Sequence, residues 1–367
     1  MEKLWKYKKI GEVCIVERGA SPRPIDKYIT DNESGINWIK IGDTSDSMYI
    51  TETAQKIIVE GMKKSRYVKP GDFLLSNSMS FGRPYILKID GCIHDGWLVL
   101  RDENALFDKR FLYYYLSSKT TYKKLKSMAV GGVVNNLNSE MVRNVIVPVP
   151  DKEEQSEIAD LFDKIKKILD DRKQELEQLD TLVKSRFAEM FGDPIRNPKG
   201  WKVVTIGDIV TEVRYGTSKP AVEGGKYPYL RMNNLTADGH LDLNDLKYID
   251  ISDDEVEKCV VRKGDVLFNR TNSIDLVGKT AVFDLQDDMV IAGYIIRVRL
   301  NEKILPEVLS QYMNLEALKD ILRSMAKGAV NQANINAQEL QSIRVYVPDI
   351  ELQKQFVEMK DQVDKSK

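Results

Sequence analysis

The chain has 367 residues, of which 42% are hydrophobic and 30% are charged, and its formal net charge at pH 7 is −1. This composition is typical of a folded protein rather than a disordered one, and the length favours two or three domains over a single core. No run of about 18 apolar residues occurs, so we expect no membrane-spanning helix, and a near-neutral charge means that any nucleic-acid surface must come from local basic clusters.

The cysteine and histidine content argues against two further classes of site. Cys14, Cys92 and Cys259 stand far apart, which favours buried thiols in a reducing cytoplasm over a disulfide framework. The only histidines are His94 and His240, so we expect no metal site. The first nine residues are charged and lack the apolar segment of a signal peptide, which also favours a cytoplasmic protein.

Up to residue 150, the sequence predicts a domain of mixed strands and helix. Short runs rich in Val, Ile and Tyr alternate with Gly, Asn, Asp and Pro, a pattern typical of strands and turns. Apolar residues at every third or fourth position predict a helix over 107–128. The predicted strands are 36–41, 72–75, 97–100 and 142–149.

A segment of different character follows over 151–192. Pro150 ends the preceding strand, and Asp151 with Glu154 three residues later forms a capping-box pattern. Apolar residues then recur with a period near 3.5 until Gly192 and Pro194, and some 40 residues at 1.5 Å each make a rod of about 60 Å. A heptad seam needs a partner helix, although an ordinary amphipathic helix packed on one domain is the alternative. The seam residues are Ile158, Phe162, Ile165, Leu169, Leu176, Leu179, Val183 and Met190.

The second half of the chain shows the same features as the first. A helix is predicted over 305–325, and a final helix over 349–367 carries seam residues Leu352, Phe356, Met359 and Val363. Because Lys367 aligns with Leu169, we expect this final helix to be short, either by nature or because the sequence is truncated. The predicted strands are 227–232, 266–268, 294–300 and 343–347.

An internal repeat explains this likeness. Matching residues recur in the same order at an offset of mostly 196 to 198 residues, with small insertions, which chance alignment of common turn residues rarely produces. The sequence therefore predicts an α+β protein with two homologous mixed α/β domains, 1–150 and 193–348, each followed by a coiled-coil-like helix, 151–192 and 349–367. The matches include Trp5 with Trp201, Gly19 with Gly216, Gly71-Asp72 with Gly264-Asp265, Gly82-Arg83 with Gly278-Lys279, Gly96-Trp97 with Gly293-Tyr294, Ser127-Met128 with Ser324-Met325, and Gln155 with Gln353.

The ends of the two copies carry a resemblance to a known family. In the first copy, Gly131 to Asn138 lead to Val147-Pro148-Val149-Pro150 and on to Glu153-Glu154-Gln155. In the second, Gly328 to Asn336 lead to Val347-Pro348-Asp349 and Gln353. With the alternation of domain and helix, this resembles the specificity (S) subunit of type I restriction–modification enzymes over nearly the whole chain. The short final helix departs from the usual pattern of that family.

The resemblance implies a non-catalytic subunit that binds double-stranded DNA. Each target recognition domain would read one half of a split, asymmetric site, and the helices would fix the number of unread base pairs between the halves. The two domains would be related by a pseudo-twofold axis. The helices would also dock two methyltransferase (M) subunits that methylate adenine N6, and two restriction (R) subunits would complete the enzyme. S-adenosylmethionine, ATP and magnesium would then bind to those partners and not to this chain.

Residues that read bases are expected in turns, because Arg, Lys, Asn, Ser and Thr must reach a groove of the DNA. Three pairs of turns offer such residues, and Arg18, Ser21 and Arg23 have Arg214, Ser218 and Lys219 as analogues. The second pair of turns concentrates donors beside a glycine and is the strongest candidate. The full set is Arg18, Ser21, Arg23, Lys40, Asn77, Ser78, Arg83, Arg214, Ser218, Lys219, Arg231, Asn233, Arg270, Thr271, Asn272 and Lys279.

Other residues and motifs suggest structure rather than chemistry. Asn136, Asn138, Asn334 and Asn336 recur in both copies, and residues shared by domains that read different sequences should brace loops. Gly278-Lys279-Thr280 lacks the upstream glycine of a phosphate-binding loop, because Ser273 stands there. No catalytic motif is recognised. The alternative function is a protein-interaction scaffold with two strand-rich modules on a helical strut, and scattered charge on both modules would favour it.

Overall fold

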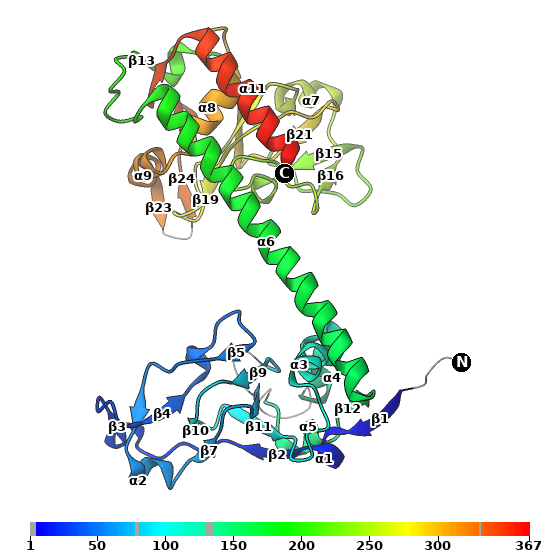
Figure 1. Cartoon of the computed structure of the whole chain (residues 1–367). Helices are drawn as coiled ribbons and strands as arrows, with labels where there is room; N and C mark the ends of the chain where they lie inside the picture. Colours follow the sequence, from blue (N-terminus) through cyan, green and yellow to red (C-terminus); the bar gives the residue numbers. More distant parts are fainter. Residues whose placement is uncertain (1–4, 78–80, 130–135, 330–331) are drawn as a thin grey trace. The chain divides into compact units, whose positions relative to one another are not determined.

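The computed structural model describes residues 5–77, 81–129, 136–329 and 332–367 (Figure 1). The chain forms two compact units, Met1–Asp171 and Arg172–Lys367, and the division falls within one long helix. Each unit has its own hydrophobic core made of several clusters of buried side chains.

The described part of the first unit combines two five-stranded sheets, one strand pair and small helices. One sheet has the order β2-β11-β8-β9-β5 and the other has the order β3-β6-β4-β10-β7, while β1 pairs with β12. The strands are β1 (Lys6–Lys9), β2 (Ile15–Arg18), β3 (Ile29–Thr30), β4 (Ile36–Ile39), β5 (Tyr49–Ile50), β6 (Lys56–Ile57), β7 (Arg66–Val68), β8 (Phe73–Ser76), β9 (Pro84–Leu87), β10 (Gly91–Ile93), β11 (Trp97–Arg101) and β12 (Ile146–Val149). The helices before the long one are α1 (Ile10–Val13), α2 (Val59–Met62), α3 (Lys109–Ser117), α4 (Lys119–Ala129) and α5 (Ser139–Arg143).

The described part of the second unit has two four-stranded sheets, one three-stranded sheet and one strand pair. Their orders are β14-β22-β18-β20, β16-β15-β21-β17, β19-β24-β23 and β13-β25. The strands are β13 (Lys202–Thr205), β14 (Val210–Tyr215), β15 (Tyr227–Leu230), β16 (Lys247–Ile249), β17 (Val260–Val261), β18 (Val266–Asn269), β19 (Thr271–Asn272), β20 (Thr280–Val282), β21 (Met289–Ile291), β22 (Ile295–Leu300), β23 (Lys327–Ala329), β24 (Gln332–Asn334) and β25 (Arg344–Val347). The helices are α7 (Asp253–Cys259), α8 (Pro306–Met313), α9 (Glu316–Met325), α10 (Ala337–Ser342) and α11 (Ile350–Ser366).

Strand pairing confirms the internal repeat. The antiparallel set β2-β11-β8-β9 has the same order and directions as β14-β22-β18-β20. In the other sheet, the parallel pair β4 and β10 corresponds to β15 and β21, with β7 and β17 antiparallel at one edge. The fold is α+β, as predicted.

The register corrects one pair of the sequence alignment. Trp97 lies opposite Ser76, and Ile295 lies opposite Asn269. Because β8 and β18 are equivalent strands, Trp97 corresponds to Ile295, and the predicted match of Trp97 with Tyr294 is wrong by one residue. The sequence alignment placed two Gly-aromatic pairs on each other, whereas the hydrogen-bond ladder fixes the true offset.

Several predicted elements differ in extent. The helices predicted over 107–128 and 305–325 are each broken into two, at Ser118 and near Leu315, where the backbone becomes extended. The strand predicted from Val142 begins only at Ile146, because Asn138 caps α5 by accepting a hydrogen bond from the Met141 N–H. The apolar pattern predicted these segments correctly as ordered but did not show the breaks.

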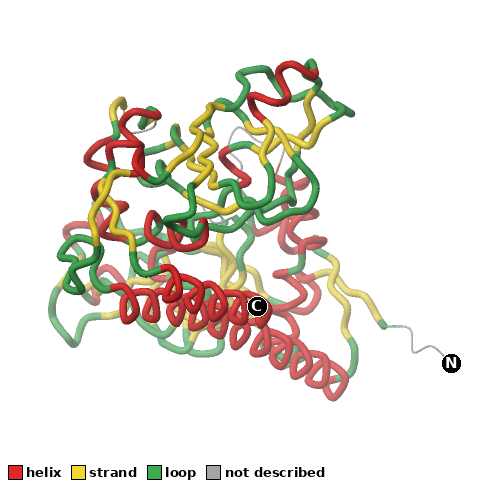
Figure 2. Tube along the Cα trace, turned by 90° about the horizontal axis from the view of Figure 1, so that it is seen from above, coloured by secondary structure: helices red, strands yellow, loops and turns green. Residues whose placement is uncertain are grey.

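The long helix α6 (Lys152–Phe191) is continuous over 40 residues. Asp151 Oδ1 accepts a hydrogen bond from the Glu154 N–H at 3.0 Å, which confirms the predicted cap. At the other end Gly192 adopts a φ of +86°, a conformation that favours glycine after a helix. Within the second unit, α11 runs beside the last turns of α6 (Figures 1 and 2), where Phe356 packs edge-on against Phe187 and Phe191.

One buried glutamine ties each helix start to its unit. The Gln155 side chain is fully buried, donates to the carbonyls of Leu106 and Pro150, and accepts from the Asp108 N–H. In the second unit the Gln353 side chain makes three equivalent hydrogen bonds. The sequence repeat of this glutamine therefore reflects a repeated structural role.

Gln353 donates to the carbonyls of Lys303 and Pro348 and accepts from the Leu305 N–H, at 3.0, 2.9 and 2.8 Å. Both glutamines are 0% exposed, and each satisfies three buried or partly buried backbone groups. The two units thus hold their following helices, α6 and α11, by the same device.

Candidate nucleic-acid interface

A close backbone approach begins the first reading turn in both units. A Cβ on Gly19 would lie 2.0 Å from the His94 carbonyl oxygen, and a Cβ on Gly216 would lie 2.1 Å from the Ile291 oxygen. Only glycine fits at these two places, which explains why the repeat retains it. The residues that follow each glycine are thereby placed against the β10–β11 or β21–β22 connection.

In the first unit this turn forms one wall of a cleft of about 590 Å³. Three of the predicted DNA-binding residues, Ser21, Arg23 and Lys40, line it together. His94 and Asp95, from the β10–β11 connection, complete the lining. The structure therefore brings together residues from two of the three predicted turns.

In the second unit the equivalent turn forms a cleft of about 620 Å³. Five predicted residues line it: Ser218, Lys219, Arg231, Asn233 and Arg270. No Asp or Glu is among its described lining residues. The cleft is therefore richer in hydrogen-bond donors than its counterpart.

The two clefts are equivalent by strand register. Trp38 lies opposite Cys92 in the first unit, and Tyr229 lies opposite Val290 in the second, so Lys40 and Arg231 follow equivalent strands. The repeat thus places two clefts of similar size in equivalent positions, with different side chains in each.

The register also corrects two predicted analogues, because Arg23 corresponds to Pro220 and not to Lys219, and Arg18 does not correspond to Arg214. Gly19 N donates to the Trp97 carbonyl and Gly216 N donates to the Ile295 carbonyl, so these glycines are equivalent. Arg18 therefore corresponds to Tyr215, and the predicted pairing of Arg18 with Arg214 is wrong. Arg18 donates from Nε to the Asp95 carbonyl at 3.1 Å, whereas Arg214 pairs with Glu212 on its own strand at 3.1 Å.

Carboxylates hold several cations of the clefts. Asp95 accepts a hydrogen bond from Ser21 Oγ and pairs with Arg23, and the Ser21 hydrogen bond is the main cause that lowers the pKa of Asp95. Burial lowers the pKa of the neighbouring His94. Near neutral pH the first cleft therefore combines an ionised carboxylate with its cations.

In the second cleft the carboxylates that pair with the cations, Glu255 and Asp245, are not among the lining residues. Lys219 Nζ lies 2.5 Å from Glu255 Oε2, and the Lys219 hydrogen bond is the main cause that lowers the pKa of Glu255. Arg231 Nη2 lies 2.7 Å from Asp245 Oδ2. Sequence reasoning missed these acidic residues because it searched turns for donors only.

Arg270 is held differently. Its guanidinium lies over the Tyr215 ring at 4.9 Å and donates to Asn334 Oδ1 at 3.0 Å and to the Gly293 carbonyl at 3.4 Å. Asn334 belongs to β24 and its side chain holds Arg270. Asn336 and Asn138 cap α10 and α5.

The turn after β8 and β18, predicted as the strongest reader, is largely structural where the structure describes it. Asn77, Thr271 and Lys279 are buried, and the Lys279 ammonium donates to the carbonyls of Met232 and Leu235. These placements argue against direct DNA contact by the three residues, because their polar groups lie inside the fold. Ser78 lies outside the described residues, and Asn272 is half-buried on β19.

Arg83 is the exception in this turn. It is exposed, and its guanidinium makes no hydrogen bond or ion pair with any residue that the structure describes, although its counterpart Lys279 is buried. Lys40, from the remaining turn, donates to Gln55 Oε1 at 2.8 Å and is half-buried.

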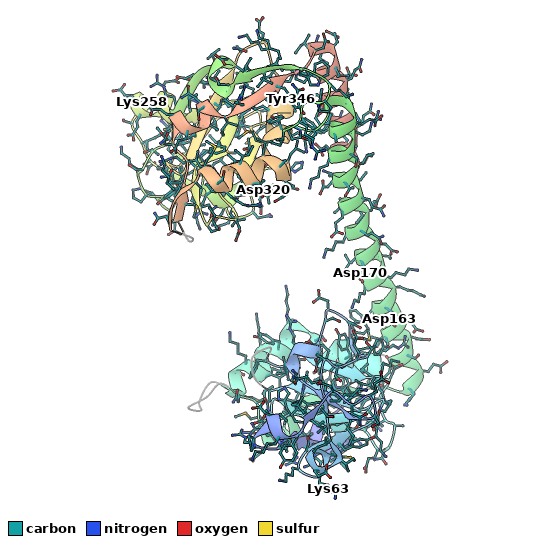
Figure 3. All side chains as sticks on the ribbon, turned by 90° about the vertical axis from the view of Figure 1, so that its left-hand side faces the viewer. Lys63, Asp163, Asp170, Lys258, Asp320 and Tyr346 are labelled. Carbon is teal, nitrogen blue, oxygen red and sulfur yellow. The ribbon has the colours of Figure 1, made fainter. Side chains whose placement is uncertain are left out.

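The seam residues divide between the two units. In the first unit, Ile158 packs on the core and Phe162 stacks on Tyr114 at 5.0 Å, close to Asp163, which is labelled in Figure 3. Ile165 and Leu169 are 44% and 65% exposed. In the second unit the seam residues that join one core cluster are Leu179, Val183, Met190, Leu352, Phe356, Met359 and Val363, while Leu176 is half-buried.

Residues 5–77, 81–129, 136–329 and 332–367 contain neither a metal-binding cluster nor a membrane-spanning helix. Within these ranges no group of three or more His, Cys, Asp or Glu side chains is placed to hold a metal ion. Within the same ranges no helix is long and apolar enough to cross a membrane.

The sequence matches a family model twice. The type I restriction modification DNA specificity domain matches residues 2–179 and 198–367. The EcoKI specificity subunit of Escherichia coli (strain K12) is 25% identical over 345 residues, which cover 88% of this chain and 72% of that protein. The StySPI specificity subunit of Salmonella potsdam is 21% identical and covers 98% of this chain and 82% of its own length.

Solved structures show the same fold. A chain from work on the assembly and conformational transition of a type I R-M system aligns with a TM-score of 0.59 at 20% identity, covering 99% of this chain and 90% of that one. The S subunit from M. genitalium aligns with a TM-score of 0.53 at 14% identity, covering 100% and 90%. Because the family model matches twice and spans well over half of the sequence, the chain belongs to the type I restriction modification DNA specificity domain family.

Proposed function

We propose that this chain is the DNA sequence-specificity subunit of a type I restriction–modification enzyme, in which each unit reads one half of a bipartite, asymmetric site. The observation that carries the proposal is the pair of equivalent clefts, about 590 and 620 Å³, which are lined by different side chains. A shared frame gives both units the same way of meeting DNA, and different linings give them different half-sites. Curated relatives that carry the name specificity subunit support this assignment.

The helices are proposed to set the gap between the half-sites. Duplex DNA rises about 3.4 Å per base pair and an α-helix rises about 1.5 Å per residue, so seven residues of helix correspond to roughly three base pairs. A pseudo-twofold relation between the units would suit the antiparallel strands of DNA. This relation and the domain limits 1–150, 151–192, 193–348 and 349–367 are part of the proposal.

Partner subunits are proposed to supply the chemistry. In this proposal two methyltransferase subunits dock on the helices and two restriction subunits complete the enzyme. S-adenosylmethionine, ATP and magnesium would bind to those partners, and the chain itself would have no catalytic role. The assembly would act in the cytoplasm.

The test is methylome sequencing of cells that express the chain with its methyltransferase subunits. We expect methylated adenines in one bipartite motif, and replacement of 216–221 by the corresponding first-unit residues 19–24 should change only one half of it. Deletion of seven residues, 164–170, from the exposed part of α6 should shorten the unread gap by roughly three base pairs. A motif that survives both changes would overturn the proposal in favour of a scaffold role.

A further inference from the structure

In the first unit, one carboxylate joins a hydroxyl and a cation from the same short turn. Asp95 Oδ1 accepts from Ser21 Oγ at 2.8 Å, and Asp95 Oδ2 lies 3.3 Å from Arg23 Nη2. The Arg23 side chain is 82% exposed, and its Nε and Nη1 groups have no partner among the residues that the structure describes. We call Ser21, Asp95 and Arg23 the first clamp.

The second unit contains the same arrangement. Glu255 Oε1 accepts from Thr217 Oγ1 at 3.0 Å, and Glu255 Oε2 lies 2.5 Å from Lys219 Nζ. Hydroxyl and cation are again two residues apart in the turn that begins at the repeated glycine. The Lys219 side chain is 51% exposed. Thr217, Glu255 and Lys219 form the second clamp.

The internal repeat does not account for this likeness. Asp95 lies between β10 and β11, and its counterpart by register is Gly293. Glu255 comes instead from α7, and Arg23 corresponds to Pro220 rather than to Lys219. The two units therefore build one arrangement from different elements, so inheritance of a common frame is not its cause.

Stability does not account for the clamps either. Ion pairs between exposed side chains contribute little to folding, because water screens the charges and long side chains lose entropy when they are held. What a clamp does is to fix the direction of an exposed cation. Fixed, exposed donors that line a cleft are suited to recognising a ligand.

The carboxylate distinguishes between two parts of DNA. A phosphate would be repelled by Asp95 or Glu255, whereas the edge of a base carries no net charge. In the major groove, guanine presents two acceptors, N7 and O6, and Arg or Lys contacts to these atoms are the commonest specific contacts. Adenine and cytosine each present an amino group, which a cation does not favour.

We propose that Arg23 and Lys219 are specificity-determining residues that each select a guanine, one in each half-site, with Asp95 and Glu255 as positioning residues. This inference rests on the proposed function, because it names the base that each cleft prefers. Arg83 provides the contrast: its guanidinium has no carboxylate partner among the described residues, so it is suited to a phosphate.

The test uses the full chain bound to its methyltransferase subunits to select duplexes from a random library. For Arg23→Ala we expect the preference for one G·C pair in one half-site to fall by roughly 10–100-fold, and for Lys219→Ala a similar loss at one G·C pair in the other half-site. Arg262→Ala is the matched control, because the Arg262 side chain is 42% exposed and paired with carboxylates but does not line the cleft. It should leave the motif unchanged.

A chemical probe removes the need for a variant to fold. Replacing the guanine by 7-deazaguanine removes the N7 acceptor, so binding by the unaltered protein should weaken at the two assigned positions by at least several-fold. The Arg23→Ala protein should not respond to the substitution in its own half-site but should still respond in the other.

Four results would overturn the inference. The first two are that Arg23→Ala or Lys219→Ala relaxes only an A·T pair, or that it lowers binding to all duplexes equally, as a lost phosphate contact would. A motif that neither variant nor 7-deazaguanine alters would show that the clamps only brace their turns. If the unaltered complex selects no bipartite sequence at all, the proposed function itself fails and this inference fails with it.

Discussion

The two units use one frame but differ in what they place inside it. At one strand position of the central sheet, the first unit has Val99 and the second has Arg297, and both side chains are buried. At the turn after the next strand, Arg83 is exposed whereas Lys279 is buried. At both positions the second unit therefore buries a cation. At the equivalent positions the first unit has a buried apolar residue and an exposed cation.

The residues that the two units share interact mainly with the backbone. Gln155 and Gln353 make the same three hydrogen bonds to backbone groups in their respective units. Gly19 and Gly216 meet the same carbonyl environment. Shared residues thus satisfy the backbone, and differing residues occupy the strand faces and the cleft walls.

The largest expected effect concerns the buried charge that only the second unit contains. Arg297 is 1% exposed, pairs with Glu212 at 2.7 Å and donates to the Val260 carbonyl. Arg297→Val, which introduces the residue of the first unit, should lower the free energy of unfolding by roughly 3–5 kcal/mol, because it leaves a carbonyl without a donor and an unfilled space. Hydrogen exchange resolved by peptide should show the loss in residues 172–367 only.

Arg297→Met separates charge from volume in the same experiment. The methionine fills most of the space, so the part of the loss that remains belongs to the ion pair and the Val260 carbonyl. A loss below about 1 kcal/mol for both variants would mean that an apolar residue serves this position as well in the second unit as in the first.

The next effect tests whether the shared glutamines are equivalent. Gln155→Ala and Gln353→Ala each remove the partner of one buried and two partly buried backbone groups, so each should cost about 2–3 kcal/mol of unfolding free energy in its own unit. Peptide-resolved hydrogen exchange measures both. Gln338→Ala, at an exposed position on α10, is the control and should change stability by less than about 0.5 kcal/mol. Unequal costs would show that the two helix starts are held differently.

The repeat, the strands and the long helix could be predicted because each depends on local pattern. Glycines at fixed spacing, alternating apolar runs and the cap at Asp151 all express backbone requirements that act within a few residues. The break at Ser118 has a local cause that the apolar pattern does not show, because Ser118 Oγ accepts a hydrogen bond from the Thr121 N–H and so caps α4. The break near Leu315 has no such signal, because leucine is a good helix former.

The candidate site was predictable only in part, for a physical reason. Turns rich in donors indicated where Ser21, Arg23 and Lys219 lie, and the fold brings them to the clefts. Their carboxylate partners, Asp95 and Glu255, are 72 and 36 residues away in sequence from the cations that they hold. Pairing over such distances follows from the tertiary fold, through the β10–β11 connection for Asp95 and through α7 for Glu255, and has no local signal.

A smaller effect is expected from a histidine in the second unit. His240 Nδ1 lies 3.2 Å from Asp238 and Nε2 lies 3.6 Å from Asp364, and the hydrogen bond to Asp238 is the main cause that raises the pKa of His240 to about 9. The folded state therefore binds the proton more tightly than the unfolded state. The stabilisation is complete below the unfolded pKa near 6.5 and is lost as pH rises through about 9.

Solvent screening limits this effect, because the His240 side chain is 38% exposed. We expect the unfolding free energy of the second unit to fall by about 1–2 kcal/mol between pH 6.5 and 9, relative to His240→Asn. The difference between the two proteins cancels the other groups that titrate in this range. Parallel stability curves for the two proteins, measured by urea denaturation at each pH, would contradict the prediction.

The smallest effect concerns the unpaired cation that only the first unit exposes. Arg83 has no partner among the described residues, so Arg83→Ala should leave stability within about 0.5 kcal/mol of the original. If Arg83 contacts a phosphate, the variant should weaken binding to every duplex alike and reduce the slope of log K against log salt by about 1. Fluorescence anisotropy with the cognate duplex and a scrambled one, each at several salt concentrations, measures both.

Because Lys279 is already bonded to two carbonyls inside the second unit, Lys279→Met should instead lower stability without this change in slope. A salt slope that responds to Lys279→Met and not to Arg83→Ala would reverse the contrast between the units.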